Sequence, residues 1–303
     1  MFIARNRKIF LGIGLTLVVL SLLSVLIFGL RFSVEFTGGS IIEVSVEGNE
    51  VEKETITEAV SENLPEDRAM VQEFGDSGFV IRTPFLDEDI HAGVTNALTS
   101  IEGVTIDRES SVGPTIGSEL RQKSIIAISI VVVLIVLFVA FAFRHVSKPI
   151  SSWMYGGATI ATLIHDITVT TGVFTILGVV AGAEVDSLFV VALLTILGYS
   201  VNDTIVVFDR IRENLRRNEE KNNEEDFETT IGHSIDQTIT RSINTSLTTS
   251  LALLSLYVFG GSTTQIFALT LLVGVIAGTY SSIFFASPLL ITIERWRYNR
   301  KQK

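Results

Sequence analysis

Long uninterrupted apolar blocks constrain this chain more than any other feature of its sequence. The first block runs from Ile9 to Leu30 and holds 22 residues. Further blocks lie at about 124–143, 152–180, 188–208, 239–260 and 265–291. About 20 residues, at about 1.5 Å per residue, cross a hydrocarbon core about 30 Å thick. The blocks therefore predict a polytopic α-helical membrane protein with six transmembrane helices.

The N-terminal block resembles a signal sequence because basic residues precede its apolar run. The run is longer than the apolar core of a signal peptide, and no small-residue cleavage site follows it. We expect residues 1–30 to form an uncleaved anchor helix.

The distribution of basic residues predicts the orientation in the membrane. With both termini in the cytoplasm, 16 of the 23 Lys and Arg residues fall on the inside. These inside segments are 1–8, 144–149, about 209–241 and 294–303. The other seven lie in the long outside segment, where folded domains cross largely regardless of charge. We therefore expect a multi-pass protein of the cytoplasmic membrane with a cytoplasmic loop at about 209–241.

Residues 31–123 read as a separate extracytoplasmic domain. Alternating apolar residues predict strands at 40–46, 68–74, 78–84 and 104–112, and a helical stripe is present at 50–64 and 87–101. The stretch Gly75-Asp76-Ser77-Gly78 is typical of a hairpin turn. The order β-α-β-β-α-β predicts an α+β ferredoxin-like fold. Residues 124–303 then form a five-helix transmembrane bundle.

Composition excludes several classes of site. The chain has no cysteine and four scattered histidines, so neither a disulfide framework nor a metal site is predicted. No glycine-rich phosphate loop and no basic-aromatic patch is visible, so we expect no cofactor and no nucleic acid. The outside domain carries a net charge of −12. A solvated, salt-adapted surface explains that charge most simply.

An amide and a carboxylate lie side by side inside the fourth apolar block, at Asn202 and Asp203. An ionisable residue at the centre of a span costs roughly 2.5–3.5 kcal/mol, so such residues usually face the bundle interior and have a function. Arg241 begins the next block at a comparable depth. An Asp203–Arg241 ion pair is therefore geometrically reasonable, and Asn202 and Thr245 supply further polar groups.

Two interpretations of this pair remain open. The pair is either a fixed salt bridge that selects helix packing, or a switch in which Asp203 binds and releases a proton. Burial favours the protonated form of a carboxylate and a nearby arginine favours the ionised form, so movement of the arginine would change proton binding. His165 and Asp166, in the third block, either extend a proton relay or serve only in packing.

Several longer motifs resemble the SecF family of membrane proteins. They are GYSVNDTIVVFDRIREN (198–214), FTGG (36–39), VGPTIGSELRQKS (112–124), HD (165–166) and YVFGG (257–261). The resemblance covers nearly the whole chain. One departure lies before the glycines, where Val34-Glu35 replaces the usual Ile-Asp; because the acid is kept, we expect the turn Phe36-Thr37-Gly38-Gly39 to survive.

The resemblance implies a function. Members of the family share the architecture of the RND transporters and pair with SecD into a twelve-span unit. They use the proton-motive force to promote export of polypeptides that have passed the SecY channel. The proton-linked residues of the family correspond to Asp203, Arg241 and Thr245. The resemblance also implies a separate SecD partner, contact with the translocating polypeptide and no enzymatic activity.

Three rival functions are compatible with parts of this sequence. An RND-type exporter of small molecules or lipids would share the proton pair, but would carry both halves of the bundle in one chain. An intramembrane aspartyl protease would need Asp166 and Asp203 to share a proton across a water. A structural scaffold would tolerate neutralisation of Asp203.

Overall fold

The computed structural model describes residues 2–47, 51–64, 69–74, 78–144, 150–221, 223 and 225–301. The chain divides into a helical unit, Met1–Arg31 with Ile126–Lys303, and an α/β unit, Phe32–Ile125. Six helices in the described residues are long and apolar enough to cross a membrane. The prediction of a six-span membrane protein is confirmed.

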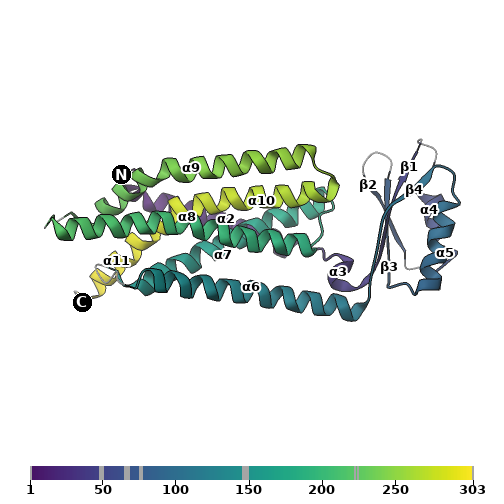
Figure 1. Ribbon diagram of the computed structural model, residues 1–303, viewed down its shortest axis with the longest axis horizontal. Helices are drawn as coiled ribbons and strands as arrows, with labels where there is room; N and C mark the ends of the chain where they lie inside the picture. Colours follow the sequence, from purple (N-terminus) through teal and green to yellow (C-terminus); the bar gives the residue numbers. More distant parts are fainter. Residues whose placement is uncertain are drawn as a thin grey trace. The chain divides into compact units, whose positions relative to one another are not determined.

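The helical unit consists of long helices that lie side by side, with both ends of the chain at the same end of the unit (Figure 1). Its elements are α1 (Phe2–Arg5), α2 (Arg7–Phe28), α6 (Pro114–Ala142), α7 (Ser152–Val180), α8 (Ser187–Glu220), α9 (Phe227–Phe259), α10 (Ser262–Tyr280), the π-helix η1 (Ser281–Ala286) and α11 (Ser287–Lys301). The first turns of α6 belong to the α/β unit. α10, η1 and α11 follow one another without a break, so the last apolar block forms one continuous helix with a π-helical segment inside it.

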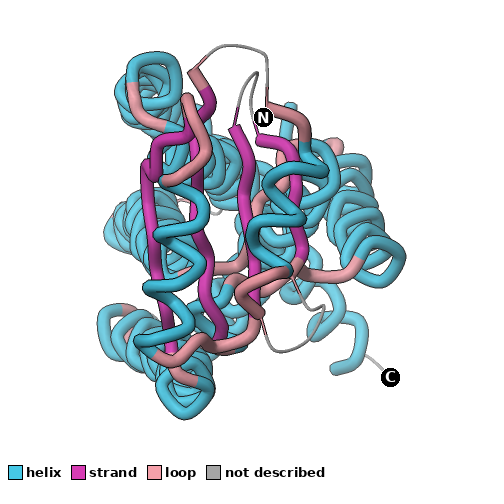
Figure 2. Tube along the Cα trace, turned by 90° about the vertical axis from the view of Figure 1, so that its right-hand side faces the viewer, coloured by secondary structure: helices cyan, strands magenta, loops and turns pink. Residues whose placement is uncertain are grey.

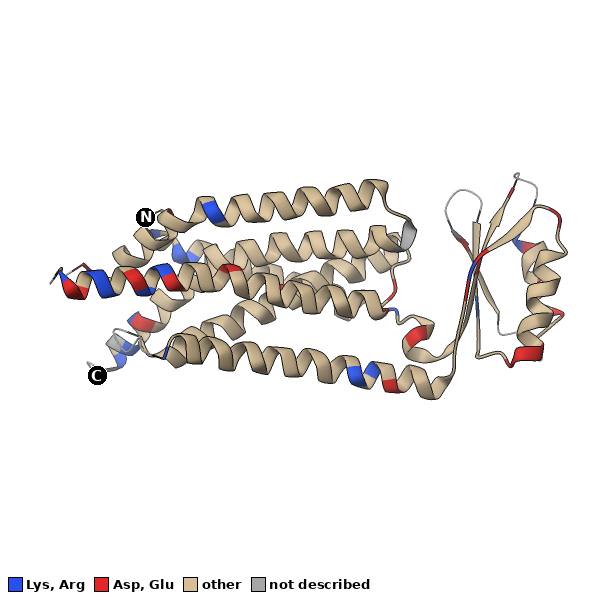
Figure 3. Cartoon of the chain, in the orientation of Figure 1, with Lys and Arg blue, Asp and Glu red and all other residues tan. Residues whose placement is uncertain are grey.

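The segment at about 209–241, expected to be a loop, is mostly helical. α8 continues to Glu220 and α9 begins at Phe227. Charges of opposite sign line the last turns of α8 (Figure 3), where Arg216 pairs with Glu220 at 2.8 Å. Such i,i+4 pairs stabilise a solvated helix, which is why the charge run does not interrupt α8.

Glycines bring the helices of the unit into close contact. A Cβ on Gly172 of α7 would lie 2.5 Å from the Cα of Ser21 in α2. Ser24 donates a hydrogen bond to the carbonyl of Gly172 at 3.0 Å, so the two backbones cross closely there. A Cβ on Gly274 of α10 would overlap Ile196 of α8. Gly278, one turn further along α10, also packs against α8, where a Cβ would lie 3.1 Å from the Cβ of Ser200.

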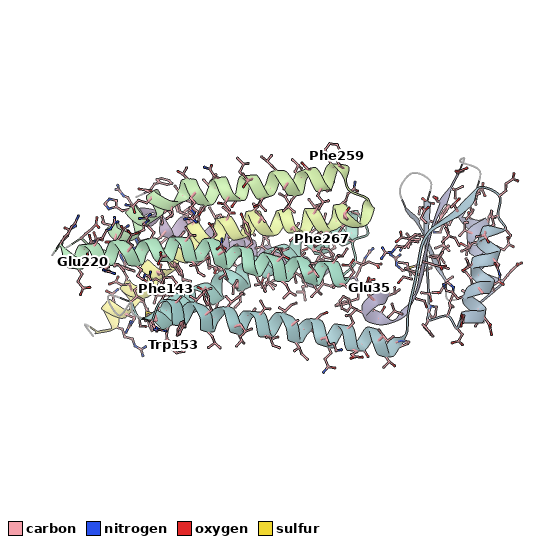
Figure 4. All side chains as sticks on the ribbon, in the orientation of Figure 1. Glu35, Phe143, Trp153, Glu220, Phe259 and Phe267 are labelled. Carbon is pink, nitrogen blue, oxygen red and sulfur yellow. The ribbon has the colours of Figure 1, made fainter. Side chains whose placement is uncertain are left out.

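Aromatic and charged contacts join the helices at the end of the unit where the two chain ends lie. Phe143 stacks on Tyr155 with ring centroids 5.2 Å apart. Figure 4 labels Phe143, which is 2% exposed, and Trp153, which is 72% exposed. Glu228 of α9 pairs with Arg7 of α2 at 2.8 Å and also with Arg295 of α11. The first and last long helices are thus joined through α9.

The α/β unit is a four-stranded antiparallel sheet with the strand order β2-β3-β1-β4. Figure 2 shows helices covering one face of this sheet. The elements are α3 (Val34–Thr37), β1 (Gly39–Val46), α4 (Lys53–Ser61), β2 (Met70–Phe74), β3 (Gly78–Thr83), α5 (Glu88–Thr99) and β4 (Val104–Val112). The predicted ferredoxin-like fold is confirmed. Residues 75–77 of the predicted turn lie outside the described residues.

Candidate functional site

Asp203 lies on the packed face of α8, where its side chain is buried and only 8% of the residue is exposed. Its Oδ1 accepts a hydrogen bond of 2.5 Å from the Ser242 hydroxyl of α9. Its Oδ2 is buried and has no hydrogen-bond partner among the described residues. A buried carboxylate is normally paired or fully hydrogen-bonded, so this one is only half satisfied.

The expected ion pair between Asp203 and Arg241 is not formed. No salt bridge within 4.0 Å joins these residues in the part of the chain that the structure describes, and Arg241 is exposed. Successive residues on an α-helix point about 100° apart. When α9 turns Ser242 toward α8, its neighbour Arg241 is therefore carried to the outer surface. Asn202 and Thr245 are exposed as well.

Arg241 nevertheless lies at a depth similar to that of Asp203. Asp203 is 16 residues from Ser187, at the start of α8, and Arg241 is 18 residues from Phe259, at the end of α9. At about 1.5 Å per residue these separations correspond to about 24 and 27 Å. A rotation of α9 about its axis, rather than a shift along it, separates the observed arrangement from an ion pair.

A second buried polar group surrounds Asp166 of α7. His165 Nδ1 lies 2.8 Å from Asp166 Oδ1, and the two residues are 1% and 0% exposed. Asp166 Oδ2 accepts hydrogen bonds from the hydroxyls of Ser281, at 2.8 Å, and Ser200. His165 and Asp166 thus contact α8 and η1, which confirms that they face the interior of the unit.

Hydroxyl groups connect these helices, and three of them, on Ser200, Ser281 and Ser282, were not predicted from the sequence. Ser282 of η1 lies 2.9 Å from the Thr204 hydroxyl and donates to the carbonyl of Ser200 at 3.2 Å. Ser200 and Thr204 lie one turn apart on α8. Their i,i+4 spacing within an apolar block was the available signal. Serines 281 and 282 gave no comparable signal because a π-helix sets their direction.

The predicted turn at Phe36–Gly39 is present in the α/β unit. Phe36 is buried, and Gly38 and Gly39 have φ values of 76° and 140°, which favour glycine. A Cβ on Gly38 would lie 2.6 Å from the Cα of Pro114. The turn is therefore packed directly against the beginning of α6, where the VGPTIG stretch lies, and it fixes how β1 begins.

The two buried carboxylates do not form a protease dyad. Asp203 bonds to Ser242, whereas Asp166 bonds to His165, Ser200 and Ser281. A shared proton between two carboxylates requires oxygens that face each other at close range. The observed partners instead place the two carboxylates in separate hydrogen-bonded groups.

The chain matches two family models. Residues 93–296 match the family described as "Protein export membrane protein SecD/SecF, C-terminal". Residues 23–50, which include the Phe36–Gly39 turn, match the "SecD/SecF GG Motif". The first match covers most of the helical unit, including Asp203, Arg241 and the His165-Asp166 pair.

Several characterised proteins are similar over their full length or over one part. The chain is 39% identical over 299 residues to the protein translocase subunit SecF of Anaerolinea thermophila, covering 97% of this chain and 95% of the relative. It is 34% identical to the protein translocase subunit SecDF of Thermus thermophilus, covering 90% of this chain and 35% of that longer relative.

Solved structures agree with this similarity. The crystal structure of SecDF, a translocon-associated membrane protein from Thermus thermophilus, superposes with a TM-score of 0.83 at 33% identity. The alignment covers 96% of this chain and 38% of that one. SecDF in its super-membrane-facing form gives a TM-score of 0.68 at the same identity, with coverage of 100% and 39%.

These matches place the chain with transport subunits, not with enzymes or small-molecule exporters. Two independent segments, the turn at Phe36–Gly39 and the helices around Asp203, carry the family's sequence features. The chain therefore belongs to the SecF branch of the SecD/SecF family, whose members are membrane subunits of the Sec protein translocase.

Proposed function

We propose that this subunit uses the proton-motive force to promote polypeptide export, with a proton bound and released at Asp203. The observation that carries the proposal is the half-satisfied carboxylate, which has Ser242 on Oδ1 and no partner on Oδ2 among the described residues. This carboxylate lies inside a candidate span, and no Lys or Arg among the described residues forms a salt bridge with it within 4.0 Å. Binding a proton there neutralises a buried charge, which is favourable in an apolar environment.

Arg241 supplies the means to release that proton. Its guanidinium stays charged at all physiological pH values. Rotation of α9 that brings Arg241 toward Asp203 would stabilise the carboxylate and expel the proton, and the reverse rotation would allow a proton to bind. In this account Thr245, one turn from Arg241 on the same helix, contacts the arginine when it moves inward. The cycle converts proton movement into helix movement.

SecD is the proposed partner in the membrane. The side chains of Asn202, Arg241 and Asn244 are exposed in α8 and α9, and none makes a hydrogen bond or ion pair within the described residues. Polar side chains at this depth are costly against lipid, so a second protein would cover them. Relatives that carry SecD and SecF in one chain support SecD as that protein. SecY and the translocating polypeptide complete the proposed assembly.

The proposed orientation places both termini in the cytoplasm and the α/β unit outside. Both ends of the chain lie at one end of the helical unit, as an even number of spans requires (Figure 1). The short segments near that end carry most of the Lys and Arg residues, in agreement with the positive-inside rule. Attachment of a membrane-impermeant reagent to single cysteines placed in this cysteine-free chain would test the orientation.

The test of the proposed function is polypeptide export in membrane vesicles that contain this chain and SecD. Wild type is compared with Asp203→Asn, with and without an imposed proton gradient, after equal assembly is verified. Asp209→Asn is the matched control, because Asp209 is an exposed carboxylate on the same helix, paired with Arg212 at 2.5 Å. Loss of gradient-dependent export in Asp203→Asn alone supports the proposal. Unchanged gradient dependence in that variant contradicts it.

A further inference from the structure

The His165-Asp166 pair is an ionisable group that the proposed cycle at Asp203 does not use. Both side chains lie in the middle of α7 and are at most 1% exposed. Charged or titratable groups buried to this extent are costly and are normally retained for a function. Their surroundings show what that function is.

The contacts of the pair define which imidazole nitrogen carries hydrogen. Asp166 accepts hydroxyl hydrogen bonds from Ser200 and Ser281 on Oδ2, as an ionised carboxylate does. With Asp166 ionised, its Oδ1 accepts the hydrogen bond from His165 Nδ1–H. The other nitrogen, Nε2, then carries a free lone pair. It is buried and has no partner among the described residues.

The ring of His165 is held in a fixed position. It stacks between Tyr280 and Phe285, with ring centroids 5.8 and 5.3 Å away. The hydroxyl of Tyr280 donates to the carbonyl of Phe10 at 2.7 Å and so holds the stack against α2. A carboxylate that fixes one imidazole nitrogen and leaves the other free as a base is an arrangement suited to proton binding.

Hydrogen bonds through Ser200, Ser282 and Thr204 connect this pair to the turn of α8 that carries Asp203. Ser200, bonded to Asp166, precedes Asp203 by three residues on α8, a rise of about 4.5 Å. Ser282 joins Thr204 to the carbonyl of Ser200.

The π-helix is the element that makes the connection. A π-helical turn is rare and is found frequently at functional sites. Here η1 directs two consecutive serines, Ser281 and Ser282, to different partners, the first to Asp166 and the second to Thr204 and Ser200. One short segment thus contacts both the carboxylate of α7 and the turn of α8 that carries Asp203.

We propose that the His165-Asp166 pair is a second proton-binding site, linked by hydrogen bonds through Ser200, Ser282 and Thr204 to the turn of α8 that carries Asp203. A proton from water forms an N–H bond at His165 Nε2, and the pair changes from a net charge of −1 to zero. Release reverses the step and returns the proton to water. This inference rests on the proposed function, because it gives the proton of that cycle a second place to bind.

Few other titratable groups face the pair. α8 contributes Asp203, and α10 contributes Tyr280. The sequence of η1 holds no titratable side chain, and α2 and α11 hold theirs near the chain ends, Arg7 and Lys8 in the one and residues 294–301 in the other. A change of protonation measured at His165 is therefore separable from its surroundings by replacing Asp203.

Nitrogen-15 NMR of the full chain in lipid bilayers tests the proposal directly. Replacing His91, His145 and His233 with Gln leaves His165 as the only histidine. The two nitrogen signals distinguish the Nδ1–H form, the Nε2–H form and the imidazolium. We expect the Nδ1–H form at high pH and conversion to imidazolium as the pH is lowered, while the protein stays folded.

Three results decide whether His165 binds a proton as proposed. Conversion in the parent and also in Asp203→Asn supports the second site, whatever Asp203→Asn does to export. A His165 that stays neutral over the whole range in which the protein is folded overturns it. In Ser281→Ala, which keeps the carboxylate, the Nδ1–H form should persist; a switch to the Nε2–H form would contradict the assigned role of Asp166.

The link to Asp203 has its own test in gradient-driven export. Ser282→Ala removes the hydroxyl between Thr204 and Ser200, and we expect gradient-dependent export to fall several-fold while gradient-independent export is kept. Thr170→Val is the matched control, because Thr170 is 1% exposed and its hydroxyl has no partner among the described residues. Equal export by the two variants would overturn the link.

Discussion

Asp203 and Ser242 are joined across α8 and α9 by a hydrogen bond of 2.5 Å, in the place where an Asp203–Arg241 ion pair was expected. Positioning the Asp203 carboxylate and changing its charge were both expected of Arg241, but the structure gives the first role to Ser242. Ser242 holds the carboxylate in place, and Arg241, one residue earlier and exposed, remains free to act on it when α9 rotates. Each residue can therefore be tested separately.

Removing the Ser242 hydroxyl should impair gradient-dependent export. A hydrogen bond to a charged group contributes about 1.5–3 kcal/mol, so we expect a decrease of about tenfold or more in Ser242→Ala. Ser242→Thr, which restores a hydroxyl, should recover most of the activity. Ser255→Ala, at an exposed position of the same helix, serves as the control. Full activity in Ser242→Ala would show that the hydrogen bond is dispensable.

The crossing of α2 and α7 predicts an asymmetry between two glycines of one helix. Gly172→Ala forces its Cβ against the backbone of Ser21 and should lower the free energy of unfolding by about 1–3 kcal/mol. Gly157→Ala, whose Cβ would meet no atom within 4 Å, should leave it unchanged or slightly raised. Thermal unfolding in detergent compares the two. Equal unfolding temperatures for the two variants would mean that α2 and α7 can move apart at Gly172 at little cost in free energy.

The turn at Phe36–Gly39 should be sensitive to a single methyl group. Gly38→Ala adds a Cβ at a φ of 76° and 2.6 Å from the Cα of Pro114, so we expect a loss of about 1–3 kcal/mol in local stability. Hydrogen exchange of α3 and the start of β1 measures it. Gly113→Ala, with no atom within 4 Å of the added Cβ, should exchange like wild type. Faster exchange in both variants would argue against a specific contact.

Asp226 caps the N-terminus of α9, and its carboxyl group should make the stability of the protein depend on pH. Hydrogen bonds from Thr229 lower the pKa of the Asp226 carboxyl below its usual value. The stabilisation is therefore present above the unfolded-state pKa of about 3.9 and is lost as the pH falls through the lower folded-state value. Asp226→Ala should cost about 1 kcal/mol at neutral pH and progressively less below about pH 4.

Thermal unfolding across this pH range provides the measurement for Asp226. Asp226→Asn keeps a capping oxygen, so it should retain most of the stability and lose the pH dependence. A cost for Asp226→Ala that stays constant down to low pH would show that the charge contributes nothing.

The sequence was sufficient to predict the six spans and the α/β unit because both rest on local patterns. Apolar length identifies a span, and the alternation at 40–46 and 104–112 identifies strands that the structure places at 39–46 and 104–112. The segment at 209–241 was expected to be a loop because it begins with many charged residues and no apolar block, a composition that is also typical of solvated loops. Pairs such as Arg216–Glu220 instead extend the helix into solvent.

The site was only partly predictable for a different reason. Asp203 stands out because a carboxylate in an apolar block is rare, and so does His165-Asp166. Ser242 does not stand out among the many serines of α9, since which of them faces α8 depends on the rotation of the helix. The directions of Ser281 and Ser282 depend on a π-helical turn, for which the sequence carries no recognised pattern.

The infrared spectrum of the reconstituted protein, recorded while the pH is varied, tests the central claim most directly. A carboxylic acid and a carboxylate absorb at different frequencies, so proton binding at a buried aspartate is visible as a titrating band. We predict such a band in wild type and in Asp209→Asn, and its loss in Asp203→Asn, with Asp166→Asn separating any contribution of the second carboxylate. A spectrum unchanged by Asp203→Asn would contradict proton binding at Asp203 and leave the residue with a packing role.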